Sequence, residues 1–313
     1  MFFLPLFDNN PTGRTPFISW LILAICVIVF LWQTGLSASD EYELFLGFGV
    51  VPALLFGHQV LPDGLAAVSP YISIFTSMFL HGGWLHLGSN MLYLWIFSDN
   101  VEDSMGSVKF ILFYALCGIG AALCQSVIDP YSVTPMVGAS GGIAGVLGAY
   151  ILLHPKAAVR VFMLILIFIR VISLPAWVVL GVWIAGQFVS APAALSGGGG
   201  VAYFAHIGGF LTGMVLVPFF KHRDVPLFDR DSPSDTPNWS TQPISFAELK
   251  TEAAERYPRA SHRMGRRHGR GGSVPSVRRR IKGPWDKSQG INRKDKPFGY
   301  FSHQVNVELS RSR

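Results

Sequence analysis

Charged residues are scarce in this chain and unevenly distributed along it. They make up 14% of the 313 residues, whereas 50% are hydrophobic and the mean hydropathy is +0.39. Soluble domains carry about 25% charged residues, so this composition excludes an ordinary soluble domain. Residues 1–220 hold 5 Lys and Arg against 9 Asp and Glu, a net charge of −4, and residues 221–313 hold 20 against 10, a net charge of +10. The chain therefore divides into an apolar body and a basic tail with few aliphatic residues for a core.

Cysteine is also rare. The three cysteines, Cys26, Cys117 and Cys124, all lie in apolar stretches. Buried free thiols behave as small hydrophobic side chains, which is the role that we expect for these three. The sequence thus offers no disulfide framework and no redox function.

Long apolar runs are what the body has in abundance. A membrane-spanning helix needs about 20 predominantly apolar residues. The candidate segments are 18–33, 84–98, 110–128, 140–153, 174–189 and 201–220. The sequence therefore predicts an all-α membrane protein, with a six-transmembrane-helix bundle over residues 17–220. Residues 1–16 form an N-terminal segment, and residues 221–313 form a largely disordered tail.

One further apolar run is too short to cross a membrane. Residues 159–169 are bracketed by Arg160 and Arg170, and we predict that they form a connector in the membrane interface.

Basic residues are absent from every second connection between the predicted spans. No Lys or Arg occurs in residues 37–80, 125–139 or 190–203. Cytoplasmic loops are the ones enriched in Lys and Arg, so both termini are predicted to be cytoplasmic. The spans that begin near Ser140 and near residue 201 then both enter from the outer face, which brings Ser140 and His206 to a similar depth.

Ser140 and His206 are polar residues in segments that should lie in lipid, where a polar side chain needs a reason to be present. Ser140 stands in Gly138-Ala139-Ser140-Gly141-Gly142, and His206 in Ala205-His206-Ile207-Gly208-Gly209. A serine hydroxyl becomes a nucleophile when a base such as histidine takes its proton. The alternative is that both residues simply hydrogen-bond neighbouring helices. The last two spans contain no Asp or Glu, so a dyad is possible and a Ser-His-Asp triad is not.

A second polar cluster lies at the start of the second span. His86 and Asn90 are four residues apart and share a helix face, and His81 precedes them at the boundary. Asn and His side chains, together with the Ser140 backbone N–H, are suitable donors for an oxyanion hole. The alternative is that these side chains connect the helix to the preceding loop, which is the role that we favour for His81.

Two other chemistries fit these residues poorly. His81 and His86 are five residues apart, and Gly82 stands where a metalloprotease helix needs glutamate, so we expect no metal and no other cofactor. Gly138-x-Ser140-x-Gly142 matches the nucleophile elbow of α/β-hydrolases, but a loop with two prolines precedes it instead of a strand.

Together, these motifs resemble the rhomboid family of intramembrane serine proteases over roughly residues 14–220. The resemblance implies that Ser140 is the nucleophile and His206 the base. It also implies that His86, Asn90 and the Ser140 backbone form the oxyanion hole, and that Glu102 anchors helix ends.

The sequence departs from the family pattern at two places. Ala144 stands where many members have an aromatic residue that stacks on the histidine, and Tyr203 or Phe204 could compensate for it. The Trp-Arg pair of the family's first outer loop is absent, because residues 37–80 contain no Arg.

The resemblance predicts a serine endopeptidase that cleaves single-span membrane proteins in the bilayer. An inactive rhomboid-like protein that binds transmembrane helices is the alternative, and a small-solute transporter is a weaker one. A bacterial inner membrane is the expected location.

The glycines of 197–200 predict a mobile loop before the His206 span. The arginines of 263–280 predict attraction to anionic lipid, and we expect no nucleic acid as partner.

Overall fold

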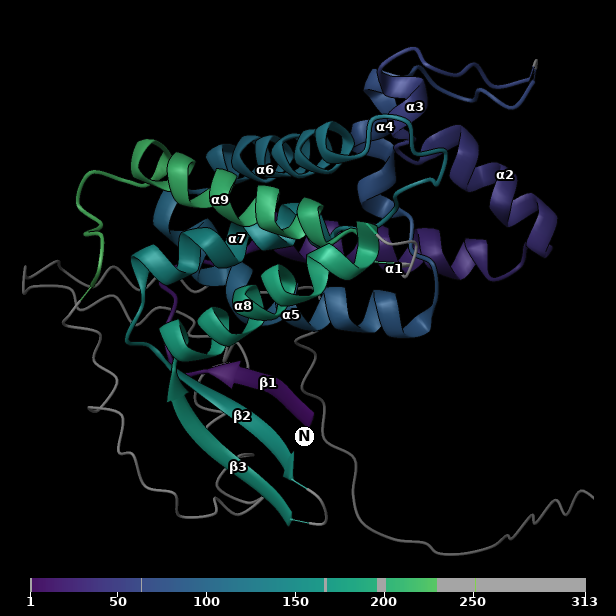
Figure 1. Ribbon diagram of the computed structural model, residues 1–313. Coiled ribbons are helices and arrows are strands. Elements are labelled where there is room, and N and C mark those ends of the chain that lie inside the picture. The colour runs from purple at the N-terminus through teal and green to yellow at the C-terminus, as the bar shows by residue number, and fades with distance from the viewer. Residues whose placement is uncertain (1, 63, 166–167, 196–200, 230–250, 252–313) are drawn as a thin grey trace, which may run out of the picture. The chain divides into compact units, whose positions relative to one another are not determined.

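The computed structural model describes residues 2–62, 64–165, 168–195, 201–229 and 251. These residues form a mainly helical body and one small sheet (Figure 1). A helix lies at each of the six predicted apolar segments: α1 (Phe17–Gln33), α5 (Trp84–Met105), α6 (Ser107–Ile128), α7 (Ser140–Leu153), α8 (Ala176–Leu195) and α9 (Tyr203–Phe220). Of these, α6, residues 176–193 of α8, and α9 are long and apolar enough to cross a membrane, whereas α1 and α7 are apolar but shorter.

Basic residues gather at one end of the helices, where α1 and α6 begin and α9 ends. Arg14 lies just before α1, and its guanidinium is 3.3 Å from the ring of His222, which follows α9. The ammonium of Lys109, in the first turn of α6, donates to the carbonyl of Phe220 at 3.2 Å. We call this the basic end.

Glu102 ties three helices together at the basic end. Its buried carboxylate accepts hydrogen bonds from the backbone N–H of Ile18 and Ser19 in the first turn of α1. It also accepts from the Ser107 hydroxyl, at 2.6 Å, where α6 begins. Gly106 joins α5 to α6 with φ of +81°, a conformation that favours glycine. A carboxylate at two helix N-termini is favourably placed, because the free N–H groups there carry partial positive charge.

Small residues bring α6, α7 and α9 into close contact. A Cβ atom added at Gly209 would overlap the carbonyl oxygen of Gly141, and one added at Gly213 would overlap that of Gly145. A Cβ at Gly141 would also lie 2.6 Å from the Cβ of Ala121 in α6. Small residues allow this approach, and close van der Waals packing is a main source of helix association in lipid. We call this contact the glycine seam.

Residues 158–165 and 168–175, between α7 and α8, form two paired strands, which the predicted all-α class did not include; the predicted connector falls in this segment. Strand β2 (Ala158–Ile165) pairs antiparallel with β3 (Phe168–Pro175) and with β1 (Phe2–Asp8), giving the order β1-β2-β3. Val159 and Val161 are buried, while Arg160 between them is half-buried, as expected of alternating faces. The strands were not predicted, although β-branched residues with period two favour a strand, and the partner strand β1 lies far away in the sequence.

Short elements fill the long connection between α1 and α5. They are α2 (Ala38–Phe48), α3 (Pro52–Leu55), α4 (Pro70–Thr76) and a 3₁₀ turn, η1 (Ser77–Phe79). The Ser37 hydroxyl caps α2 by accepting from the Asp40 N–H, at 3.2 Å. In Figure 1, α2, α3 and α4 lie together at one end of the long helices.

The predicted tail begins with residues that contact the body. The backbone N–H groups of Phe228 and Asp229 donate to the carbonyls of Leu152 and Leu153, at 2.7 and 3.0 Å. The predicted mobile loop at 197–200 and the arginines of 263–280 lie outside the described residues.

Candidate active site

Ser140 is the first residue of α7, at the end opposite the basic end. The chain reaches it through Gly138, which adopts φ of +128° and donates its N–H to the Ser77 carbonyl at 2.9 Å. Ser140 is half-buried. The helix start leaves its backbone N–H without an intrahelical acceptor, which suits it to bind negative charge.

His206 lies in the first turn of α9 and is held by side chains of α8. Its Nδ1 is 2.8 Å from Oε1 of Gln187. The Trp183 ring lies beside it, with ring centroids 5.7 Å apart and the planes tilted by 37°. Trp183 of α8 is therefore the aromatic neighbour of His206, a neighbour that Ala144 of α7 cannot provide.

The glycine seam sets the relative depth of Ser140 and His206. Gly209 packs on Gly141 and Gly213 packs on Gly145, so α7 and α9 run parallel with an offset of 68 residues. Ser140 and His206, 66 residues apart, therefore start the two helices at nearly the same level. Among the described atoms, the serine hydroxyl and the histidine ring form no direct hydrogen bond. In free enzymes such bonds are often long and shorten only when substrate binds.

His86 and Asn90 of α5 converge on the backbone just before Ser140. A Cβ added at Gly138 would lie 2.7 Å from Nε2 of His86 and 3.6 Å from Nδ2 of Asn90. Asn90 is 6% exposed, and its Nδ2 has no hydrogen-bond partner among the described residues. A buried, unsatisfied donor costs about 1–3 kcal/mol. This free donor lies next to Gly138, two residues before Ser140.

His81 lies next to His86 but has a different environment. Its backbone N–H donates to Gln33 Oε1 at 3.1 Å, and its carbonyl accepts from Gln33 Nε2 at 3.0 Å, which fastens it to the end of α1. The His81 ring is fully buried and 5.2 Å from the His86 ring. Burial, together with the nearby charge of His86, lowers the pKa of His81 to about 4.

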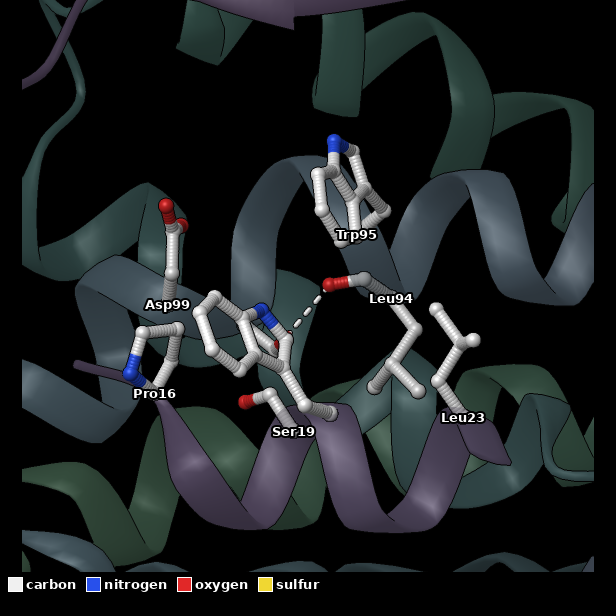
Figure 2. A pocket seen from close by; sticks show the side chains of 8 residues that line it. Pro16, Ser19, Leu23, Leu94, Trp95 and Asp99 are labelled. Atoms are coloured by element: carbon white, nitrogen blue, oxygen red, sulfur yellow. Dashed lines mark hydrogen bonds between the residues drawn. The ribbon is translucent and has the colours of Figure 1, made fainter. Parts of the chain in front are cut away.

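No group of three or more His, Cys, Asp or Glu side chains within the described ranges is arranged to hold a metal ion. A small cavity is present elsewhere, between α1 and α5 (Figure 2). It is lined by Pro16, Ser19 and Leu23 on one side and by Leu94 and Asp99 on the other. None of these is a predicted site residue, so the cavity is separate from His86, Asn90, Ser140 and His206, which we call the Ser140 cluster.

Comparison with known proteins agrees with this architecture. The family described as "Rhomboid domain" matches residues 69–223, which include all the residues of the Ser140 cluster. Rhomboid-like protein 11, chloroplastic, from Arabidopsis thaliana is 35% identical over 220 residues, and the match covers 67% of each chain. The chain belongs to the rhomboid family.

Other rhomboid relatives match shorter regions. Rhomboid protease GluP of Bacillus subtilis is 31% identical over 43% of this chain, and Rhomboid protein 1, mitochondrial, of Saccharomyces cerevisiae is 32% identical over 47%. The chain covers only 24% and 41% of the lengths of these two relatives. As a rhomboid family member with several apolar helices, the chain is a membrane protein.

Gln187 and Trp183, which contact the His206 ring, were not among the predicted site residues. Gln187 is the only amide side chain in α8, an otherwise apolar helix without Asp, Glu, Lys or Arg. A single amide side chain in a membrane-spanning helix needs a hydrogen-bond partner on a neighbouring helix, because lipid offers none. That signal could have identified Gln187. Its pairing with His206 depends on how α8 packs on α9, which the sequence does not reveal.

Proposed function

We propose that this rhomboid is an intramembrane serine endopeptidase with a Ser140–His206 dyad. The supporting observation is the convergence of three helices on one point: Ser140 starts α7, His206 lies in the first turn of α9, and His86 and Asn90 of α5 flank Gly138. In the proposed reaction His206 takes the proton of the Ser140 hydroxyl. The oxygen then attacks the scissile carbonyl of a membrane-protein substrate.

The developing negative charge on the carbonyl oxygen requires hydrogen-bond donors. The Asn90 amide, the His86 ring and the Ser140 backbone N–H take this role in our proposal. His206 then protonates the leaving amine, and water hydrolyses the acyl-enzyme. Each oxyanion donor is worth about 10²–10³ in kcat in related chemistry.

The proposed topology has six spans, with the basic end in the cytoplasm. Arg14 and Lys109 support it, because both lie at that end and cytoplasmic loops are enriched in such residues. The active site then faces the outer half of the membrane, and its substrates are single-span membrane proteins. The bacterial inner membrane stays a prediction, since relatives with mitochondrial and chloroplastic names exist.

Ser140→Ala and His206→Ala test the proposal. We expect the intact chain in liposomes to cleave a reporter with a helix-destabilised transmembrane segment, and to be labelled at Ser140 by a fluorophosphonate. Both substitutions should lower kcat by at least about 10³-fold, as loss of a nucleophile or its base does. Ser190→Ala, on α8, is the matched control and should leave cleavage unchanged.

Two results would contradict the proposed protease function. One is cleavage that persists in Ser140→Ala, and the other is a chain that binds transmembrane segments but neither cleaves them nor reacts with the probe. The second result would favour the inactive, helix-binding alternative.

A further inference from the structure

The Gln187 amide lies between two fixed partners, which determines its orientation. Its Nε2 donates to the carbonyl of Trp183, one turn earlier in α8, at 3.2 Å. A carbonyl oxygen only accepts, so the amide nitrogen must face Trp183. Oε1 then faces His206, at 2.8 Å from Nδ1.

This orientation selects one tautomer of His206. Because Oε1 only accepts, Nδ1 must carry the hydrogen, and a neutral imidazole has just one N–H. The lone pair is therefore on Nε2, the nitrogen that can act as a base. The Trp183 ring packs beside the imidazole and limits its rotation.

Charged groups around His206 are few. Helices α7, α8 and α9 contain no Asp, Glu, Lys or Arg, and the one such residue of α6, Lys109, lies at the basic end. His86 of α5 is the titratable group whose charge acts on His206. A neutral amide can orient the ring here without placing a charge in an apolar environment, which would be costly.

We propose that Gln187 is a positioning residue that completes a Ser140–His206–Gln187 relay, in the place that aspartate takes in a serine-protease triad. The proposal rests on the proposed protease function. Gln187 touches neither substrate nor the reacting atoms, and it acts only by holding His206 in the base-competent tautomer.

The test compares Gln187→Leu and Gln187→Glu with the intact chain in liposomes, by steady-state cleavage from pH 5 to 9. Leucine has a similar size but no acceptor, so we expect kcat to fall about 10- to 100-fold, part of the 10²–10⁴ that general-base catalysis contributes. KM should change less than about twofold, since such a residue acts on the transition state. Glutamate keeps an acceptor and should retain most of the activity.

The pH profile separates positioning from simple loss of structure. A carboxylate beside His206 would favour its protonated form, so the acidic limb of the Gln187→Glu profile should move to higher pH. Gln125→Leu is the matched control, because the Gln125 side chain accepts from the Ala205 N–H at 3.3 Å, next to the ring but not on it. It should leave kcat and the profile unchanged.

The outcomes distinguish this proposal from the protease function itself. If the intact chain cleaves the reporter and Gln187→Leu has the same kcat and pH profile, Gln187 is not a positioning residue although the protease stands. Equal losses in Gln187→Leu, Gln187→Glu and Gln125→Leu would also overturn it, since damage to packing would explain them. If the intact chain does not cleave the reporter, the proposed protease function is overturned, and the Gln187 proposal, which rests on it, is overturned with it.

Discussion

Two histidines near Ser140 differ in what surrounds their rings. The His206 ring has the Gln187 amide at Nδ1, whereas neither ring nitrogen of His81 has a hydrogen-bond partner among the described residues. His81 is instead held through its backbone by Gln33. The first environment stabilises one tautomer, and the second disfavours any charge on the ring.

The buried ring of His81 predicts a pH-dependent stability. The pKa of His81 is lowered to about 4 in the folded protein, whereas it is about 6.5 in an unfolded chain. Above about pH 6.5 the His81 ring is neutral in both the folded and the unfolded state, so its titration does not reduce the free energy of unfolding. As the pH falls from 6.5 towards 4, only the unfolded state takes up the proton, and the free energy of unfolding decreases. We expect the melting temperature in detergent to fall over this range.

His81→Gln should flatten that dependence. Its melting temperature at pH 7 can be lower, but the decrease between pH 6.5 and 4 should be smaller than in the intact chain. Parallel curves for the two proteins would show that other groups cause the decrease.

At the scale of whole helices, the glycine seam determines where the catalytic candidates meet. Gly141 and Gly145 of α7 contact Gly209 and Gly213 of α9 through their backbones. No side chain can adapt at such a contact, so a single added methyl group must push the helices apart.

Gly213→Ala should therefore both destabilise the protein and reduce its activity. The added Cβ overlaps the Gly145 carbonyl, and overpacking of this kind costs about 1–3 kcal/mol. Because α9 would shift relative to α7, labelling of Ser140 by a fluorophosphonate should slow although Ser140 and His206 are unchanged. Gly181→Ala on α8 is the matched control, since nothing lies within 4 Å of its added Cβ. Equal melting temperatures and labelling rates for the two variants would contradict a close seam.

Hydropathy predicted the helices well and the sheet not at all. The predicted segments 18–33 and 140–153 differ from α1 (Phe17–Gln33) and α7 (Ser140–Leu153) by at most one residue, because a helix buries its apolar residues locally. Strand β1 acquires its structure only by pairing with β2, a non-local contact without a periodic signal. The contact between Gln187 and His206 was not predicted for the same reason, since it depends on how a neighbouring helix packs, whereas Ser140 and His206 were predicted as site residues from residue type and spacing.

At the scale of the molecule, β1 connects the sheet to the helices that carry the site. Asp8, at the end of β1, is fully buried. Its Oδ2 accepts from the Tyr150 hydroxyl of α7 and from Asn100 Nδ2 of α5, the latter at 3.3 Å. The N-terminal strand is thus bonded to the Ser140 helix and to the His86 helix.

Asp8→Ala should destabilise the whole body. It leaves the Tyr150 hydroxyl without its carboxylate acceptor, and losing a buried hydrogen-bond partner costs about 1–3 kcal/mol. A double-mutant cycle with Tyr150→Phe, measured by thermal unfolding in one detergent, isolates the pair. The double variant should be less destabilised than the sum of the two single variants, and strict additivity would mean that the pair is not coupled.

The position of β1 also bears on how this protein can be handled. Residues 2–8 pair along β2, and Asp8 is bonded to two long helices, so a fluorescent protein or affinity tag joined directly before residue 2 would continue into a paired strand. A bulky fusion there would compete with sheet formation during folding. Yields and activities measured with such a fusion would then report on the tag as much as on the protein itself, and a reporter inserted in a surface connection is the better choice.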